Sequence, residues 1–184
     1  MVQTSDEPLT AEHPEILAEF ALQGFDGVRA FSADPERSRE FFEQTLGFQP
    51  QKDDTWEVRG ERRGSTYEFD APPEGIGIGG AGTVHHVAWA SAIDEHDAWR
   101  DRVAAGGGHV TPIIDRYYFK SIYFREPSGV LFEIATIGPG FATDEPIEHL
   151  GERLSLPPAF EHLREQVEPL LTPLPNPRET AAAP

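Results

Sequence analysis

Two short segments of the chain carry residues that bind metal ions, each within a strand-like pattern. The first is TVHHVAWAS (83–91), which contains the neighbouring histidines His85 and His86. Side chains alternate between the two faces of an extended strand, so only one of these histidines can enter a given cavity. His85 shares its face with Val87 and Trp89, whose bulk suits packing against a helix. His86 shares its face with small alanines, which leave room for a ligand site.

The second segment is GVLFEIAT (129–136), with Glu133 at its centre. The residues on the opposite face of this strand are all apolar, which predicts that the strand is buried. A carboxylate there is costly to bury unless it is paired or bound to a metal. A hydrogen-bonded position in the core or at its rim is the alternative for both Glu133 and His86. Together the two residues predict one divalent-metal site, and its ligands must be nitrogen and oxygen atoms because the chain has no cysteine.

The composition excludes several other classes of function. The formal net charge of −17 opposes binding to nucleic acids and to anionic membrane surfaces. No apolar run is long enough to span a bilayer, and the N-terminus lacks the pattern of a signal peptide, so we expect a cytoplasmic protein. Lys52 and Lys120 are the only lysines among 15 basic residues, against 32 acidic ones. This balance is typical of salt-adapted proteins and predicts a halophilic source.

Two motifs of other enzyme classes are absent or out of context. The glycine-rich stretch 75–82 begins with a literal GxGxxG, but a strand follows it where a dinucleotide-binding motif needs the start of a helix. We therefore interpret it as a linker. The chain has no GxSxG sequence, so hydrolase chemistry has no support.

The elements that would position the metal ligands occur twice along the chain. A strand, a helix and two or three further strands are expected in 20–74 and again in 83–137, joined by the linker 75–82. The helices are expected at 34–48 and 93–107. Either copy alone would leave one sheet face bare, so we expect an α+β fold in which two βαβββ modules form a curved mixed sheet cup with the helices outside.

Three further segments flank these modules. Residues 1–19 are expected to be a polar leader, and 138–171 a C-terminal helical extension with short helices near 144–153 and 158–168. Residues 172–184 are rich in proline and alanine, which predicts a disordered tail.

Beyond these patterns, the succession of GTVHHVAWA, DRYYFKSIYFREPSGVLFEIAT, GPGF and DEPIEHLGERLSLPP resembles the C-terminal part of a known enzyme group. This group is the hydroquinone-cleaving extradiol dioxygenases of the vicinal oxygen chelate (glyoxalase/bleomycin resistance/extradiol dioxygenase) superfamily. The resemblance covers roughly residues 20–170 and is most specific over 115–141. It implies the paired βαβββ cup and a non-haem Fe(II), or Mn(II), held by two histidines and one carboxylate. It assigns His86 and Glu133 as two of these ligands.

The resemblance also implies roles for residues near the metal. The tyrosine of the extradiol signature falls on Tyr123, which is expected to transfer a proton or position oxygen. The histidine that opens the signature falls on Arg116, so the chain departs there from the catechol-type pattern. Tyr118 and His85 are expected nearby in weaker roles. Ordinary strand packing is the alternative for the two tyrosines.

The third ligand is missing from the place where the resemblance puts it. Longer members of the family take their first metal histidine from an earlier module, and the position that matches His86 in the first copy of this chain is Gly27. Three explanations are open. In the first, a partner chain, which is a separately encoded N-terminal half, supplies the histidine. In the second, Glu68 completes the ligand set, because it lies in STYEFDA as Glu133 lies in GVLFEIAT. In the third, the protein is degenerate and inactive.

These inferences lead to one expected function and two alternatives. We expect a metal-dependent extradiol-type ring-cleaving dioxygenase subunit or domain that acts on a small hydroquinone- or catechol-like aromatic and O2. It would work as a homodimer or as a hetero-oligomer with an N-terminal-half protein. A glyoxalase-like lyase or isomerase would instead take a fourth ligand from Glu68 or a dimer mate. A non-catalytic small-molecule-binding protein would need an aromatic groove, for which the candidates are Trp56, Tyr67 and Trp89.

Overall fold

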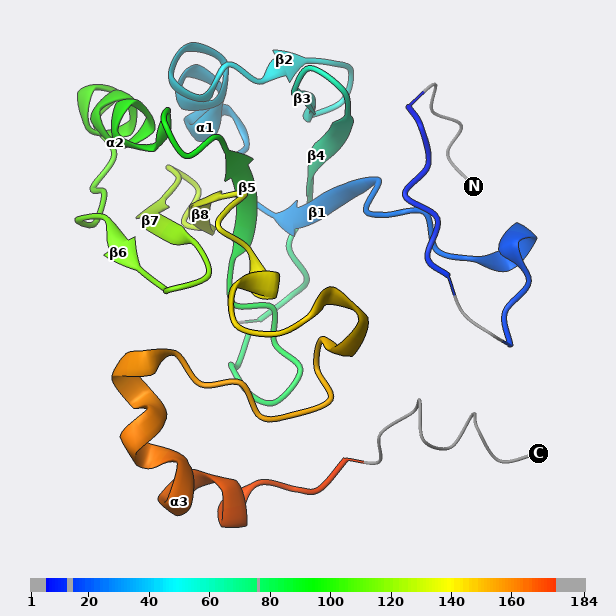
Figure 1. The fold of residues 1–184 in the computed structure, drawn as a ribbon. Helices are drawn as coiled ribbons and strands as arrows, with labels where there is room; N and C mark the ends of the chain where they lie inside the picture. Colours follow the sequence, from blue (N-terminus) through cyan, green and yellow to red (C-terminus); the bar gives the residue numbers. More distant parts are fainter. Residues whose placement is uncertain (1–5, 13–14, 76, 175–184) are drawn as a thin grey trace.

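The strands form two four-stranded mixed sheets with the same internal order. The computed structural model describes residues 6–12, 15–75 and 77–174. The first sheet has the order β1-β4-β3-β2 and the second the order β5-β8-β7-β6 (Figure 1). The strands are β1 (Gly27–Phe31), β2 (Gln49–Pro50), β3 (Thr55–Arg59), β4 (Gly64–Asp70), β5 (Val87–Ser91), β6 (Ile114–Asp115), β7 (Lys120–Arg125) and β8 (Leu131–Thr136). In both sheets the first strand runs parallel to the last, and the other neighbours are antiparallel. The matching orders confirm the predicted α+β fold with two βαβββ modules.

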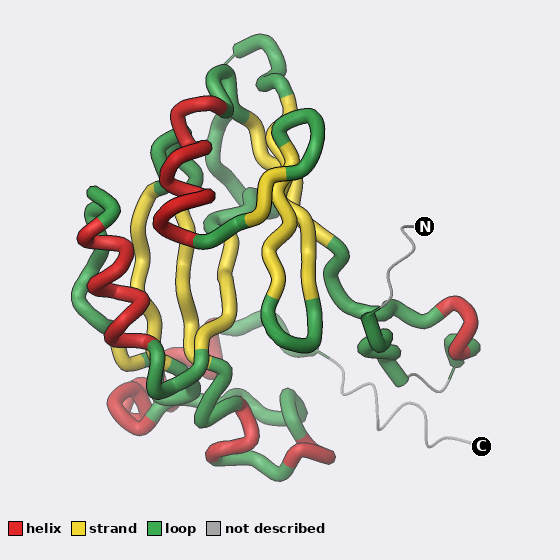
Figure 2. Tube along the Cα trace, turned by 90° about the horizontal axis from the view of Figure 1, so that it is seen from above, coloured by secondary structure: helices red, strands yellow, loops and turns green. Residues whose placement is uncertain are grey.

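Each module places one helical segment between its first and second strands. In the first module, α1 (Glu36–Glu40) continues as the π-helical segment η2 (Phe41–Leu46). This segment ends at Gly47, whose φ of +76° suits a residue without a Cβ atom. In the second module the helix is α2 (His96–Ala105). The segments η2 and α2 contact each other and lie side by side in both views (Figures 1 and 2).

The C-terminal extension forms short helical turns. They are η3 (Phe141–Thr143), η4 (Ile147–His149), η5 (Pro158–Leu163), α3 (Arg164–Val167) and η6 (Glu168–Leu170), and one further turn, η1 (Ala18–Phe20), precedes the first module. None of these turns contains a buried residue, and Figure 1 shows the later part of the extension, in orange, apart from the sheets. The predicted tail lies outside the described residues from 175 onward, as do 1–5 and 13–14 of the predicted leader. No helix in the described part of the chain has the length and apolar character needed to cross a membrane.

Two predicted strands are shorter than expected. The strand predicted at 83–91 begins only at Val87, which pairs with Phe132 near the start of β8. His85 and His86 therefore precede the strand, so the alternation of faces expected for them was wrong. The strand predicted at 109–114 is reduced to β6, in keeping with Pro112, which has no N–H to donate to a ladder.

One aromatic core joins the two modules. The ring of Phe42 is fully buried and lies 5.1 Å from Trp56 and 5.3 Å from Tyr67, both of the first module, between ring centroids. It also stacks on Phe132 of the second module at 5.9 Å. Because Phe132 precedes Glu133 in β8, this shared core fixes the strand that carries the predicted metal ligand.

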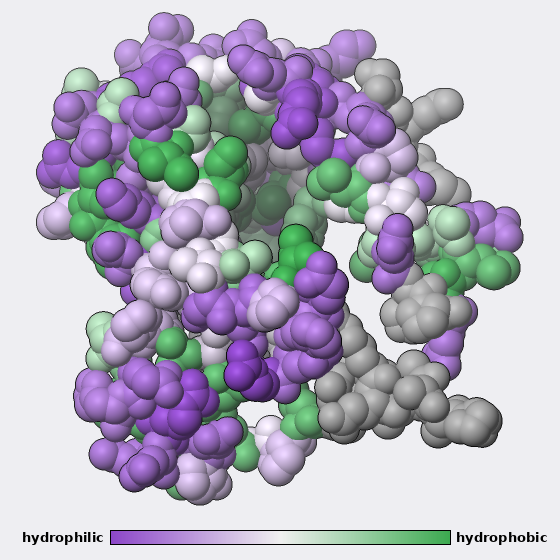
Figure 3. Space-filling model, viewed as in Figure 1, coloured by the Kyte–Doolittle hydropathy of each residue, from purple (hydrophilic) through white to green (hydrophobic). Residues whose placement is uncertain are grey.

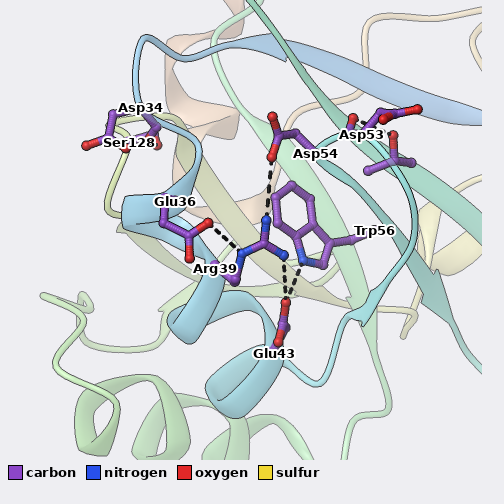
Figure 4. Close-up of polar contacts among 9 residues, drawn as sticks. Asp34, Glu36, Arg39, Glu43, Asp53, Asp54, Trp56 and Ser128 are labelled. Atoms are coloured by element: carbon purple, nitrogen blue, oxygen red, sulfur yellow. Dashed lines mark hydrogen bonds and ion pairs between the residues drawn. The ribbon is translucent and has the colours of Figure 1, made fainter.

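Arg39 fastens the first helix to its sheet (Figure 4). Its guanidinium lies 5.4 Å from the ring centroid of Trp56 and forms ion pairs with Glu36, Glu43 and Asp54 at 2.7, 3.2 and 3.5 Å. The indole Nε1 of Trp56 donates to the same Glu43 carboxylate over 3.3 Å. A cation above an aromatic face and beside carboxylates restrains α1 against β3.

A buried carboxylate ties the second module to the start of α1. Glu126 is 1% exposed, and its oxygens accept hydrogen bonds from Ser38 Oγ and from the backbone N–H groups of Ser128 and Val130 at 2.9 and 2.7 Å. Ser32 Oγ and Ser128 Oγ lie 3.0 Å apart in the same network. Three donors compensate the burial of the charge, so the turn between β7 and β8 is held against the first module.

Replacing Phe42 tests the shared core. Phe42→Ala should lower the free energy of unfolding by about 3–5 kcal/mol, because a fully buried ring leaves a cavity between the two modules. Denaturant unfolding followed by circular dichroism measures this change. Phe31→Ala, at a 60% exposed ring of β1, is the control and should cost less than about 1 kcal/mol. Equal losses in the two variants would contradict a core centred on Phe42.

His96 is buried at the start of α2. It is 1% exposed, its Nδ1 lies 3.0 Å from Ser91 Oγ, and its Nε2 has no hydrogen-bond partner in the described part of the chain. Burial lowers the pKa of His96 below its usual value, a nearby Asp97 opposes this shift, and Lys120 adds to it. The folded protein therefore holds this imidazole neutral under conditions in which the unfolded chain protonates it.

This linkage predicts that acid weakens the fold through His96. As the pH falls below about 6.5, the unfolded chain gains a proton at His96 before the folded chain does, so the free energy of unfolding decreases. His96→Asn should reduce the decrease between pH 7.5 and 5.5, measured by denaturant unfolding at each pH. His162→Asn, at an exposed histidine, should leave it unchanged. If His96→Asn and the unaltered chain lose the same stability over this range, His96 does not contribute.

Candidate metal centre

Glu133 is the buried centre of the candidate site. It lies on β8 opposite Tyr123 of β7 and Ala88 of β5, and it is 4% exposed. Its Oε1 accepts hydrogen bonds from the hydroxyl of Tyr123, at 2.6 Å, and from the hydroxyl of Ser121. Its Oε2 lies 2.8 Å from Nε2 of His86. The sequence predicted a buried carboxylate that requires compensation, and the structure supplies two hydroxyl donors and one imidazole.

His86 approaches the carboxylate from the segment just before β5. Its side chain is 32% exposed, and its Nδ1 lies 3.0 Å from Nδ1 of His85. The two rings meet edge to face with centroids 5.2 Å apart, so the histidines are neighbours and do not point to opposite sides. When the shared proton lies on Nδ1 of His86, its Nε2 keeps the lone pair that a metal needs. His85 thus contacts a predicted ligand and can fix its tautomer.

The spacing of the two predicted ligands fits one metal ion. Imidazole nitrogens and carboxylate oxygens bind divalent metals at about 2.0–2.2 Å, so two such atoms at right angles around one ion lie about 3 Å apart. Nε2 of His86 and Oε2 of Glu133 are 2.8 Å apart. The spacing is therefore compatible with one nitrogen and one oxygen ligand of a single divalent ion.

Tyr123 and Arg116 extend this group toward solvent. The guanidinium carbon of Arg116 lies 5.6 Å from the centroid of the Tyr123 ring, and its Nη2 donates to the phenol oxygen over 3.5 Å. A tight turn between β6 and β7, with Tyr117 at a φ of +70°, accompanies this position of Arg116. The Tyr123 hydroxyl thus lies between a permanent cation and the Glu133 carboxylate, where it can hold or move a proton.

Tyr118 belongs to a different contact. Its hydroxyl donates to Asp144 at 2.8 Å and lies 3.1 Å from Ser155 Oγ, both in the C-terminal extension. The hydrogen bond with Ser155 works to lower the pKa of Tyr118, but burial and the bond to Asp144 outweigh it and raise this pKa. The phenol stays protonated, and Tyr118 attaches the extension to the second module.

Glu68 is not brought into the group. It occupies in β4 the place that Glu133 occupies in β8, but Arg29 is its partner on β1 where Ala88 is the partner of Glu133. Arg29 Nη1 lies 3.1 Å from Glu68 Oε2, and the same guanidinium binds Asp70. Across residues 6–12, 15–75 and 77–174, no three histidine, aspartate or glutamate side chains are gathered closely enough to hold a metal.

The structure adds Ser121, which the sequence reasoning did not select. It is fully buried on β7, two residues before Tyr123, and its hydroxyl donates to Glu133. A signal for it existed, since residues two apart on a strand share a face and Tyr123 was already placed beside the carboxylate.

Of the three residues considered for an aromatic binding groove, two lie in the core and one lines a pocket. Trp56 and Tyr67 are fully buried, and Trp89 packs against the same core. Figure 3 shows a hollow in the middle of one face of the molecule, with hydrophobic residues in its depth and both hydrophobic and hydrophilic residues around its rim. Trp89 also lines a pocket together with Trp99 and Ile137, so Trp56 and Tyr67, but not Trp89, are enclosed in the core.

Comparison with known proteins identifies a family that the chain resembles. Residues 24–134 match the family described as "Glyoxalase/Bleomycin resistance protein/Dioxygenase superfamily". The chain is 40% identical over 163 residues to "Putative ring-cleaving dioxygenase MhqO" of Bacillus subtilis, across 86% of this chain and 52% of that protein. It is 30% identical over 167 residues to "Chlorohydroquinone/hydroquinone 1,2-dioxygenase" of Sphingobium indicum, across 85% of this chain and 51% of that protein.

A solved structure agrees with these matches. A crystal structure of a "putative dioxygenase from Bacillus subtilis subsp. subtilis str. 168" has a TM-score of 0.82 and 38% identity, across 94% of this chain and 57% of that one. The chain thus spans about half the length of the curated relatives that it matches.

Removing one carboxylate at a time tests which of them binds metal. Glu133→Gln should weaken the binding of Co(II) by about 100-fold, because a charged ligand is lost. Glu68→Gln is the matched control from the equivalent strand and should stay within about twofold of the unaltered chain, because Arg29 already pairs with it. Isothermal titration calorimetry measures both. A loss of affinity in Glu68→Gln as large as that in Glu133→Gln would contradict this assignment.

Proposed function

Because the chain belongs to the Glyoxalase/Bleomycin resistance protein/Dioxygenase superfamily, we propose that it is the metal-binding portion of a ring-cleaving dioxygenase. Its substrates would be a hydroquinone- or catechol-like aromatic and O2. One observation carries the proposal, namely the buried Glu133 carboxylate whose two oxygens face the imidazole of His86 and the hydroxyl of Tyr123. It combines two metal-binding atoms with a proton donor.

Different residues would bind the metal and transfer the proton. His86 and Glu133 would hold the ion, which we propose to be Fe(II) or Mn(II). When bound, such an ion supplies Lewis acidity and electron transfer between an aromatic diol and O2. Tyr123 holds a proton at Oη, 2.6 Å from Glu133 Oε1, and would donate it to a substrate oxygen that reaches the same hydroxyl. Arg116 donates to the opposite side of this hydroxyl, so the phenolic proton stays directed toward Glu133.

The third ligand is proposed to come from outside this chain. Two ligands leave a site of this family incomplete, and Glu68 pairs with Arg29. The chain covers only 52% of MhqO, so a partner that corresponds to the rest of such a relative could supply the missing histidine. We propose a hetero-oligomer with such an N-terminal-half protein, or a homodimer, in a salt-adapted cytoplasm. An inactive, truncated protein is the remaining explanation.

A chimera tests this proposal. The part of MhqO that this chain matches is replaced by this chain, which holds the two halves together at high local concentration. We expect the purified chimera to retain about one iron per chain and to consume O2 with hydroquinone. His86→Ala should abolish both properties, whereas His162→Ala, at an exposed histidine of η5, should preserve them.

The outcomes separate the explanations. Iron retained by the chimera but not by the isolated chain supports a ligand from the other half. Iron retained without O2 consumption would favour lyase or isomerase chemistry over ring cleavage. A folded chimera that binds no iron, or that loses none in His86→Ala, would overturn the proposed function.

A further inference from the structure

Ser121 stands out among the buried polar side chains because its hydroxyl is directed at the proposed metal ligand. We propose that Ser121 is a positioning residue that makes Glu133 bind metal through one oxygen only. It would also leave the Tyr123 hydroxyl free to act on the substrate. This inference rests on the proposed function, since it concerns the same metal site.

The hydroxyl pair of Ser121 and Tyr123 occupies one side of the carboxylate. Both side chains project from the same face of β7, and both donate to Oε1 of Glu133. The other oxygen, Oε2, faces Nε2 of His86 at 2.8 Å. A carboxylate oxygen that accepts two O–H hydrogen bonds has little capacity left for a cation. The hydroxyl pair therefore directs coordination to Oε2.

Coordination through one oxygen matters for the proposed chemistry. A carboxylate can bind a metal through one or both oxygens, and binding through both occupies an additional position around the ion. A ring-cleaving dioxygenase of this family needs open positions for the aromatic substrate and for O2. By holding Oε1 away from the metal, Ser121 would keep such a position available.

Ser121 also makes the role of Tyr123 possible. If Tyr123 were the sole donor to Oε1, this oxygen would lose its hydrogen bond whenever the phenol turned toward a substrate oxygen. Ser121 is fully buried, whereas Tyr123 is only partly buried and also contacts Arg116 at the surface. The buried hydroxyl is therefore the permanent donor, and the outer one can change partners.

The first module lacks this arrangement at its equivalent carboxylate, Glu68, whose side chain is 32% exposed against 5% for Glu133. Thr55 of β3 lies opposite Glu68 as Tyr123 lies opposite Glu133. The Thr55 hydroxyl donates to the backbone oxygen of Asp53 at 3.3 Å, and Glu68 is compensated by Arg29. In the described residues, the hydroxyl pair is thus found at Glu133, which faces a histidine, and no such pair is found at the equivalent Glu68.

Co(II) binding by the chimera, whose other half supplies the third ligand that the proposed function requires, tests the inference. Ser121→Ala should weaken Co(II) affinity by about tenfold, the low end of the effect expected for a residue that orients a metal ligand. It should also change the visible absorption of bound Co(II), because Glu133 would then be able to bind through both oxygens. Ser121→Thr keeps the hydroxyl and should restore much of the affinity and the spectrum.

Ser91→Ala is the matched control. Ser91 is a buried serine of the same sheet, but its hydroxyl lies beside His96 and not beside Glu133. This variant should bind Co(II) with the affinity and spectrum of the unaltered chimera. Thermal unfolding of each variant separates a loss of fold from a loss of binding.

Each result has a distinct meaning. Unchanged affinity and spectrum in Ser121→Ala would overturn the role of Ser121 and leave the proposed function standing. An equal change in Ser91→Ala would also overturn it, because the effect would then follow from any buried serine. If the unaltered chain and the chimera bind no Co(II), the proposed metal site itself fails, and the inference fails with it.

Discussion

A charged carboxylate inside a protein requires compensation, and the arrangement around Glu133 meets this requirement. The residue lies at the centre of β8, almost closed to solvent, with the apolar core on the other side of its strand. Two hydroxyls from β7 and one imidazole from the segment before β5 surround its two oxygens. Three strands of one sheet must therefore keep their register for the charge to be tolerated.

The first module contributes to this register although it carries none of these groups. The ring of Phe42 stacks on Phe132, the residue next to Glu133, and the Glu126 network fastens the turn between β7 and β8 to the start of α1. The second sheet is thus positioned by packing and hydrogen bonds that cross between modules. The geometry of the candidate site in the second module therefore depends on packing against the first.

The two modules carry carboxylates at equivalent positions but in different surroundings, since the Glu68 side chain is 32% exposed and that of Glu133 is 5% exposed. Glu68 and Glu133 occupy equivalent places, but Arg29 neutralises the first, and the second is left for His86 and a pair of hydroxyls. An added Cβ atom at Gly27, the counterpart of His86, would meet Thr66 at 2.2 Å, so a histidine does not fit there without movement. In the described residues, the two proposed metal ligands both lie in the second module.

The sequence by itself determined the two βαβββ modules and a buried carboxylate at Glu133 that needs compensation, because strand periodicity and the cost of burying a charge are local properties. The pairing of His86 with Glu133 and the placement of Tyr123 followed from the resemblance to extradiol dioxygenases. The sequence did not determine where β5 begins, so His85 was assigned to the wrong side, and it did not select Ser121. These features depend on which residues of β5 and β7 pair with β8. The same holds for Glu68 and Tyr118, whose partners Arg29 and Asp144 come from other strands and from the C-terminal extension. Tertiary structure decides such contacts because they join residues whose separation along the chain carries no information about their distance in space.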